Sequence, residues 1–417
     1  MKTSIITSLL VFSLLFANSC TAPEKKITEE EEKKEVPLKK MSASYKRFRE
    51  SKLRFEKYNE FNTDFQFKEI AGIGYEEGVT RRDPSSVIKV GDLYYVWYTK
   101  PQANTELVGP KKATDSTRAF HWDLCDIWYA TSTDGYDWKE QGIAVSRGSK
   151  GSYDHRSVYT TDVLVANGKY YLAYQAAGSL KQARWAGSYF HAGDFNKNVI
   201  GMSWADSPDG PWHRFEEPVL KVGSETSWDG EVVHDPSFVV REGKYWMYYK
   251  SAGRVPWKPN ISDGDFTKEF ADMPHAVIGV AVSENPEGPY IKSEYNPVLI
   301  GGHECIVWPY RKGVCAFLSE GPEGKSIQFS EDGINFYPVK HGLKKPEAGG
   351  VFRPGNFVDT DSLPGKGITW GLMHILGKWN YLRRFECNLS LEKGDRINAE
   401  YQKVLNYKNS KGYEYEK

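Results

Sequence analysis

The chain has 417 residues, with 55 acidic and 55 basic side chains and therefore a formal net charge of zero. This balance gives no sign of the basic face of a nucleic-acid-binding protein, so no nucleic-acid partner is expected. Aromatic residues make up 14% of the chain, including 13 tryptophans and 26 tyrosines. In a β-rich protein such residues either stack on sugar rings or fill sheet cores, and composition alone leaves both uses open.

The N-terminus has the features of an export signal. Lys2 precedes an apolar run over residues 5–16, which is too short to span a bilayer and ends in small residues before Cys20. Those small residues resemble a bacterial lipobox, which implies that residues 1–19 are a lipoprotein-type signal peptide and that Cys20 is lipidated. The alternative is an ordinary secretory signal with an incidental cysteine. We therefore expect an exported bacterial lipoprotein, periplasmic or at the cell surface, with a lipid anchor in a membrane.

Two segments separate this signal from the main domain. Residues 20–41 are highly charged and have little to bury, so they are predicted to be a solvated tether. Residues 42–64 are predicted to be helical, because apolar side chains between Tyr45 and Tyr58 form an imperfect stripe and Ser42 or Ser44 can serve as the N-cap. A helix this short is marginal in isolation and must dock on another surface.

Four further cysteines lie within the main domain. They show neither a Cys-x-x-Cys spacing nor a compact metal-binding pattern, and they are Cys125, Cys305, Cys315 and Cys387. Buried free thiols are the favoured interpretation, because an unpaired cysteine behaves as a small apolar residue. Disulfides are the alternative in an exported protein.

Residues 65–410 have the pattern of an all-β domain. Four stretches pair an apolar strand with an aromatic strand across a tight turn, as β-hairpins do; they are residues 85–100, 162–175, 237–251 and 306–319. Each is accompanied by a further strand that ends in serine and a turn centred on Asp-Gly or Glu-Gly; these strands lie in 126–138, 200–212, 278–290 and 326–336. Three of the serines, Ser132, Ser207 and Ser283, are 75 and 76 residues apart. A repeat of this period, without helical patterns between the strands, favours propeller blades.

A fifth, less regular unit follows in residues 349–390. It contains "GGVFRPGNFVDTD", "GITWGLMHIL" and "NYLRRFECNLS", and the isolated strand in residues 65–73 is expected to complete it by pairing. We therefore predict an all-β fold, a five-bladed β-propeller with a short N-terminal helical segment. Closing the ring in this way leaves few exposed strand edges.

Acidic residues stand where four of the predicted blades begin. They are Asp83, Asp162, Asp235 and, directly after His303, Glu304, with spacings of 79, 73 and 69 residues. Because the first strands of blades line the axis of a propeller, these side chains are expected to face one cavity. Crowded carboxylates shift each other's pKa values, which is how acid and base roles separate. The alternative is that each aspartate accepts backbone hydrogen bonds at a strand start.

Glycoside hydrolysis is the reaction that suits such a cavity. It needs a base or nucleophile on one side of the anomeric carbon and a proton donor on the other. When the base holds a water and the donor lies farther away, the reaction inverts the anomeric configuration.

The motifs "RRDPS", "HDPSFV" and "GHE" at the starts of blades one, three and four resemble those of glycoside hydrolase family 117. The resemblance covers residues 40–410, nearly all of the mature chain. It implies an exo-acting, inverting α-1,3-(3,6-anhydro)-L-galactosidase that acts on neoagarooligosaccharides from agar. It further implies that Asp83 is the base that activates water and that Asp235 tunes the acid. His303 would be the proton donor, with Glu304 contacting the sugar or serving as the acid instead.

The same resemblance implies further contacts and partners. Sugar contacts are expected from Trp122 or Trp128, Thr160 or Thr161, Asp162, Gln175 and His234. A divalent cation is expected near the site, with ligands that the sequence does not assign. A homodimer is expected through exchange of the N-terminal segment, whose Ser-x-Ala-x-x-Arg motif reads Ser42 to Arg47 here, with Ser44 in place of alanine. The alternative is an amphipathic helix on the same polypeptide.

Two other functions stay open at this point. The first is a propeller glycosidase of different specificity, arabinosidase-like or acting on another red-algal galactan, since specificity depends on loops such as 182–198 and 251–266. The second is a non-catalytic, sugar-binding surface lipoprotein. Such a protein would keep its aromatic residues but would not need acids at the starts of blades one, three and four.

Overall fold

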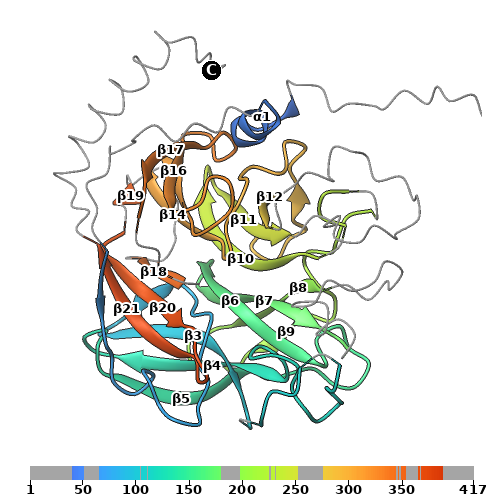
Figure 1. The fold of residues 1–417 in the computed structure, drawn as a ribbon, viewed down its shortest axis with the longest axis vertical. Helices are drawn as coiled ribbons and strands as arrows, with labels where there is room; N and C mark the ends of the chain where they lie inside the picture. Colours follow the sequence, from blue (N-terminus) through green and yellow to red (C-terminus); the bar gives the residue numbers. More distant parts are fainter. Residues whose placement is uncertain are drawn as a thin grey trace, which may run out of the picture. The chain divides into compact units, whose positions relative to one another are not determined.

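A computed structural model gives the fold of the protein (Figure 1). It describes residues 40–50, 65–103, 105–109, 111–179, 198–224, 227–230, 232–251, 276–343, 346, 349–353, 365–366 and 368–387. The predicted signal peptide with Cys20, the tether up to residue 39, and residues 51–64 of the predicted helical segment lie outside these ranges. So do residues 388–410 and almost all of the two loops to which specificity was assigned.

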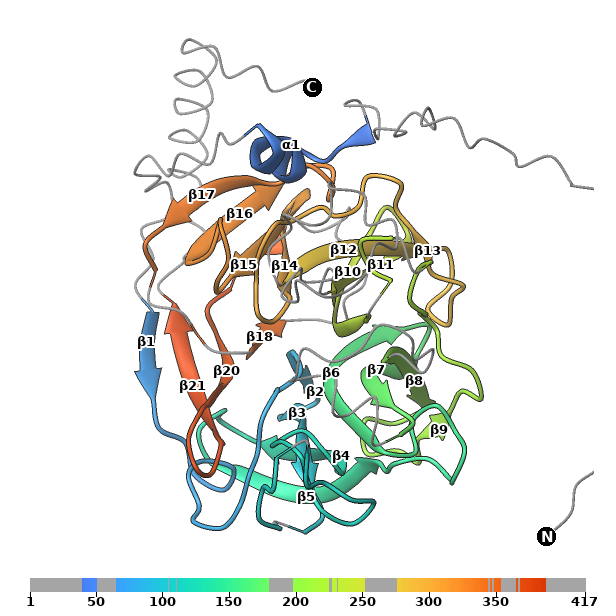
Figure 2. The same ribbon diagram turned by 45° about the vertical axis from the view of Figure 1, so that its right-hand side comes forward.

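Strands in four sheets build the domain (Figures 1 and 2). One sheet has the order β6 (Ser157–Ala166), β7 (Lys169–Ala177), β8 (Val199–Ala205), β9 (His213–Arg214). The next has the order β10 (His234–Arg241), β11 (Lys244–Ser251), β12 (Val277–Ser283), β13 (Ile291–Lys292). A third has the order β17 (Tyr337–His341), β16 (Ser326–Ser330), β15 (Gly313–Leu318), β14 (Ile306–Arg311), β19 (Gly365–Lys366). The all-β prediction is confirmed.

The fourth sheet has eight strands in two antiparallel groups. One group is β1 (Phe65–Lys68), β21 (Tyr381–Cys387), β20 (Trp370–Ile375), β18 (Gly349–Arg353), and the other is β2 (Val87–Val90), β3 (Leu93–Pro101), β4 (Cys125–Ser132), β5 (Trp138–Val145). A short parallel pairing of β18 with β2 joins the two groups, with Phe352 opposite Val87 and Arg353 opposite Ile88. The expected pairing of the isolated early strand with the last unit is confirmed, because β1 runs antiparallel to β21 (Figure 2).

All four predicted hairpins are present, and local turn chemistry explains them. In the β6–β7 hairpin, Asn167 and Gly168 have φ values of 53° and 73°. Positive φ at both central turn residues is the type I′ geometry that matches the twist of paired strands, and Asn-Gly adopts it readily. In the β10–β11 hairpin, Glu242 and Gly243 take the same signs, with φ values of 51° and 67°.

The first strands of the groups lie next to one another. Strand β6 contacts β10, β10 contacts β14, β14 contacts β18, and β18 pairs with β2. Because each sequence repeat begins with such a strand, the residues just before and at the start of β2, β6, β10 and β14 are brought close together. This arrangement positions the site described below.

Aromatic side chains account for much of the core. The large side chains that are fully buried include Trp97, Trp308, Tyr98, Tyr171, Tyr174, Tyr248 and Tyr249. Core packing therefore explains a substantial part of the high aromatic content. All four cysteines of the domain are buried free thiols, which confirms the favoured interpretation. Among the described helices, none has the length and apolar character needed to cross a membrane.

The N-terminal helix α1 (Ala43–Arg49) docks on this domain beside β16 and β17 (Figure 2). Ser42 is its N-cap, and the Ser42 side chain accepts a hydrogen bond from the backbone N–H of Tyr45. Tyr45 is buried in a core cluster together with Met41. The buried contact of this segment thus begins at Met41, inside the stretch that composition assigned to the tether.

Candidate active site

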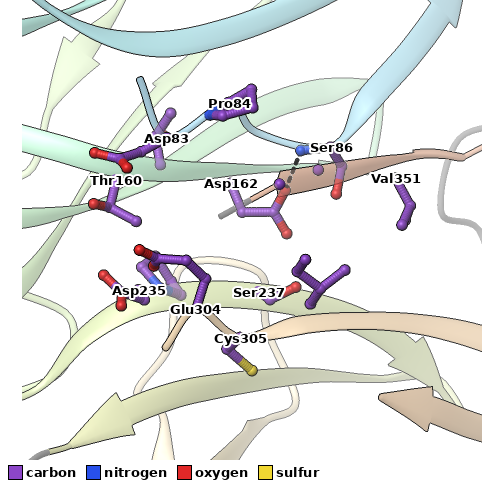
Figure 3. A pocket seen from close by; sticks show the side chains of 15 residues that line it. Asp83, Pro84, Ser86, Thr160, Asp162, Asp235, Ser237, Glu304, Cys305 and Val351 are labelled. Carbon is purple, nitrogen blue, oxygen red and sulfur yellow. Dashed lines mark hydrogen bonds between the residues drawn. The ribbon is translucent and has the colours of Figure 1, made fainter. Parts of the chain in front are cut away.

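One pocket collects the four acids at the starts of the repeats. Its lining includes Asp83, Asp162, Asp235 and Glu304, together with Thr160 and Thr161. Figure 3 shows the carboxyl groups of Asp83, Asp235 and Glu304 toward the same end of the pocket, whereas Asp162 lies nearer Ser86. The residue spacing predicts that these acids share a cavity, and the structure agrees.

The backbone at this end of the pocket is unusual. Asp83, Thr160 and Asp235 have φ values of 50°, 40° and 51°. These left-handed conformations are rare for a β-branched threonine and tend to gather at functional sites. The strand registers shift between Tyr159 and Thr161 and between His234 and Ser237, so Thr160 and Asp235 each lie in an irregularity of the β-bulge kind. Such bulges re-aim side chains next to active sites.

Asp83 is held by two neighbours that the sequence did not single out. Nε of Arg82 donates to Oδ2 of Asp83 over 2.7 Å, and the backbone N–H of Asp83 donates to Nδ1 of His374 over 3.1 Å. Burial alone would raise the pKa of the Asp83 carboxyl, but the charge of Arg82 and the contact with His374 outweigh it and hold that pKa well below its ordinary value. Asp83 is therefore an oriented carboxylate that stays ionised.

Asp235 faces a buried lysine. Nζ of Lys250 contacts Oδ2 of Asp235, donates to the backbone carbonyl of His303, and lies 4.0 Å from Oε2 of Glu304. Burial disfavours ionisation of Asp235, but the Lys250 charge outweighs it and lowers the pKa of Asp235 to about 2. His234 adds a ring nitrogen 3.7 Å from the other carboxylate oxygen.

Glu304 has the opposite titration behaviour. Burial, together with the charge of Asp235, raises the pKa of Glu304 to about 7. Nδ1 of His303 lies 2.9 Å from Oε1 of Glu304, and the charge of Glu304 raises the pKa of His303. The His303 side chain is 45% exposed and is not among the residues that line the pocket. Glu304 and His303 thus form a proton-holding pair that runs from the pocket toward solvent.

Asp162 is engaged differently from the other acids. Its two carboxylate oxygens accept the backbone N–H groups of Ser86 and Phe238, each over 2.9 Å. Arg353 lies 3.7 Å from one of these oxygens and donates to the carbonyls of Phe238 and Val307. Asp162 and Arg353 therefore link neighbouring first strands, and for Asp162 the backbone-hydrogen-bond alternative describes its contacts.

The expected sugar-contacting residues divide into two sets. Thr160 and Thr161 line the pocket, and the Thr161 hydroxyl donates to the carbonyl of Ala173. The residues outside the pocket lining are Trp122, Trp128, Gln175 and His234. Gln175 is buried and donates to the Tyr159 hydroxyl over 2.8 Å, and Trp128 lies on β4 with Nζ of Lys100 3.9 Å from its ring centroid.

Trp122 belongs to a loop that is fastened near Asp83. Its ring stacks on Phe120 with centroids 4.8 Å apart, and the Arg82 guanidinium lies 4.9 Å from the Trp122 ring centroid. A bidentate ion pair anchors the loop, because Arg156 donates to both oxygens of Asp123 over 2.7 Å. The sequence offers no signal for this pair, since each partner is an ordinary charged residue until the fold brings them together.

The residues present do not fit the expected cation site. Within the described ranges, no group of three or more His, Cys, Asp or Glu side chains is arranged to hold a metal ion. Three pocket acids already lie beside cations of the protein itself: Arg82 at Asp83, Lys250 at Asp235 and Arg353 at Asp162. No catalytic step is assigned to a metal here.

Comparison with known proteins connects this geometry to a family. The chain is similar to Zg3597, a family 117 glycoside hydrolase produced by the marine bacterium Zobellia galactanivorans, with 36% sequence identity and a TM-score of 0.67 over 80% of this chain and 93% of that one. Two other solved structures share 12% identity with it: a complex of BT0996 with RGII and a protein described as a glycoside hydrolase. Their TM-scores are 0.53 and 0.51, they cover 83% and 85% of this chain and 96% of their own, and they bear on the fold alone. No protein-family model and no curated protein matches the chain.

Proposed function

The protein belongs to glycoside hydrolase family 117, and from that premise we propose that it removes 3,6-anhydro-L-galactose from the non-reducing end of neoagarooligosaccharides with inversion. The observation that carries the proposal is the separation of proton affinities within one pocket. Glu304 keeps a proton up to a pH of about 7, whereas Asp83 and Asp235 are ionised well below that pH. Carboxyl groups whose pKa values are pushed apart in this way can divide acid and base roles.

In the proposed reaction, Asp83 is the base. It takes a proton from a water molecule as the water oxygen forms a bond to the anomeric carbon. The glycosidic bond breaks at the same centre, and Glu304 gives its proton to the departing oxygen. Arg82 and His374 keep Asp83 ionised and oriented, and Asp235 supports the protonated state of Glu304 through its negative charge.

His303 is the second candidate for the donor, as the family resemblance implied. Its ring nitrogen lies 2.9 Å from Glu304 and its pKa is raised by that neighbour, so it can hold a proton near neutral pH. Burial in the pocket favours Glu304 as the group that meets the sugar, and solvent exposure favours His303 as the group that returns a proton to Glu304 after each turnover.

The scaffold proposed for this site is a five-bladed propeller. Support comes from the succession of first strands, which contact one another from β6 to β18, and from the β18–β2 pairing, which joins the last unit to the first. Splitting the eight-stranded sheet at that pairing yields two groups of four strands, comparable with the other three sheets.

Four further features are proposed for the whole protein. Export as a Cys20-lipidated protein follows from the N-terminal sequence, and so does a periplasmic or surface location. A homodimer formed by exchange of the N-terminal segment is supported by the cohesive contacts of α1, whose Ser44 and Arg47 both bind Glu323. The family's divalent cation is kept as an expectation without a catalytic step.

Incubation of the purified protein with neoagarobiose tests the proposed function directly. The expected products are 3,6-anhydro-L-galactose and galactose, and proton NMR of the first turnovers should show the inverted anomer. The Asp83→Asn variant is the control for contaminating activity. Release from arabinosides, or from porphyran- or carrageenan-derived fragments but not from neoagarobiose, would replace the proposed substrate, and binding without turnover of any of these would favour a sugar-binding protein.

A further inference from the structure

We propose that Lys250 is a positioning residue, whose ammonium group fixes the distance between the carboxylate of Asp235 and the loop that carries Glu304. This inference rests on the proposed function, in which Glu304 donates the proton. Lys250 stands in β11, the second strand of its sheet, and is only 7% exposed. A lysine this deeply buried is uncommon unless its charge is matched.

The contacts of Lys250 join two parts of the chain that do not otherwise pair. On β11 it lies opposite His234 of β10, and its Nζ turns to Oδ2 of Asp235, the next residue of β10. The same Nζ donates to the backbone carbonyl of His303, in the loop before β14. One ammonium group therefore ties the carboxylate on β10 to the backbone directly preceding Glu304.

The hydrogen-bonding capacity of lysine matches this position. An ammonium group has three donors and no acceptor. Asp235 and the His303 carbonyl account for two donors, and Oε2 of Glu304 lies 4.0 Å away, close enough for an electrostatic effect without a direct hydrogen bond. Glu304 can therefore keep its proton while it remains next to two charged groups.

Charge balance in the pocket supports the same role. The charged or titratable groups around Lys250 are Asp235 and His234 on β10, His303 and Glu304 in the following loop, and Asp83 at a longer range. The negative charges of Asp235 and Glu304 outweigh the effect of burial and raise the pKa of Lys250. Without the ammonium charge, Asp235 and Glu304 would both repel a second negative charge, and Glu304 would hold its proton to a higher pH.

The test compares Lys250→Met, which removes the charge, with Lys250→Arg, which keeps it but changes the geometry. Lys292→Met is the matched control, because Lys292 forms a 2.6 Å ion pair with Asp229 away from the pocket acids. For each variant we would measure kcat and KM on neoagarobiose across pH. Infrared difference titration would also follow the carboxyl band that Glu304→Gln removes, and this second measurement needs no turnover.

Lys250→Met is expected to lower kcat by about 100-fold and to move the basic limb of the pH profile upward by roughly one unit or more. The Glu304 infrared band should persist to the same higher pH. Lys250→Arg should lower kcat but leave the basic limb in place, and Lys292→Met should alter neither.

A structural role alone would give a different pattern. If Lys250→Met keeps the wild-type basic limb and infrared titration, and loses only thermal stability as Lys292→Met does, the proposal is overturned. If Lys250→Met does not fold, Lys250→Arg decides, and an unchanged kcat in that variant refutes the positioning role. If the wild type does not cleave neoagarobiose, the proposed substrate fails, while the infrared comparison still tests Lys250.

Discussion

Nδ1 of His303 lies 2.9 Å from Oε1 of Glu304, and this contact joins a half-exposed imidazole to a buried carboxyl group. The pair permits a direct assignment of the proton donor. Glu304→Gln is expected to lower kcat by about 10²- to 10⁴-fold, because the amide cannot donate the catalytic proton. His303→Ala should also lower kcat heavily, but by less, with little change in melting temperature. Single-turnover rates and thermal melts of both variants decide between them, and a larger loss for His303→Ala would identify His303 as the acid.

The pH dependence of kcat should have its basic limb near the pKa of Glu304. Because that pKa is about 7, the protonated form is present below this pH and is lost as the pH rises through it. Asp83 and Asp235 are ionised far below neutrality, so neither should produce an acidic limb above a pH of about 4. Initial rates on neoagarobiose in overlapping buffers measure this profile. A profile that is flat through pH 7 would contradict the assignment of Glu304.

Asp83→Asn should separate binding from turnover. The amide keeps the size of the side chain and can still face Arg82, but it cannot accept a proton from water. Neoagarobiose binding by isothermal titration calorimetry should therefore persist within about tenfold, while kcat falls by about 10²- to 10⁴-fold. If turnover is retained, the base lies elsewhere.

Asp162→Asn provides the structural counterpart of that experiment. Both Asp162 oxygens accept backbone N–H groups, and an amide can replace only one of them while its NH₂ group meets the other donor. The expected loss in the free energy of unfolding is about 1–3 kcal/mol. Urea unfolding of Asp162→Asn and Asp83→Asn in parallel tests this contrast. Equal stability of Asp162→Asn and the wild type would show that the two hydrogen bonds carry no net weight.

The helix α1 depends on a buried acid in the neighbouring sheet region. Arg47 donates to Oε1 of Glu323, whose side chain is 1% exposed, and Ser44 binds the other oxygen. Arg47→Met should cost about 2 kcal/mol in the free energy of unfolding, because it removes a hydrogen bond to a buried charge. Ser44→Ala, which restores the alanine of the family motif, should cost less. Chemical denaturation measures both losses.

If the N-terminal segment exchanges between protomers, Arg47→Met should also shift the protein from dimer to monomer. Light scattering at several protein concentrations measures this shift. Lys40→Met is a suitable comparison, since Lys40 forms an exposed ion pair with Glu294 and should change neither stability nor oligomeric state measurably. A wild-type protein that is monomeric at all concentrations would rule out the exchange.

The sequence predicted the hairpins and the meeting of the acids well, because both depend on short-range signals. The Asn167-Gly168 turn forms its hairpin from local backbone preferences, and the repeat spacing places Asp83, Asp235 and Glu304 at equivalent positions. These features need no knowledge of which side chains meet across the fold.

The supporting residues could not be predicted for the opposite reason. Lys250 ends an aromatic strand and His374 lies within β20, and neither is marked by a motif. Their roles arise only when strands from different repeats place them against Asp235 and Asp83. Trp128 shows the converse limit: its residue type suggested a sugar contact, but its strand places it under Lys100, outside the pocket lining.

The pairing of β1 with β21 has a consequence for biosynthesis. The strand that opens the domain at Phe65 has its partner at the very end of it, at Cys387, so the ribosome must deliver nearly the whole polypeptide before this sheet can be completed. Polypeptides that terminate before residue 381 would leave β1 without its neighbour and expose the edge of β20. Such fragments are expected to aggregate or to be degraded rather than to persist as partly active enzyme.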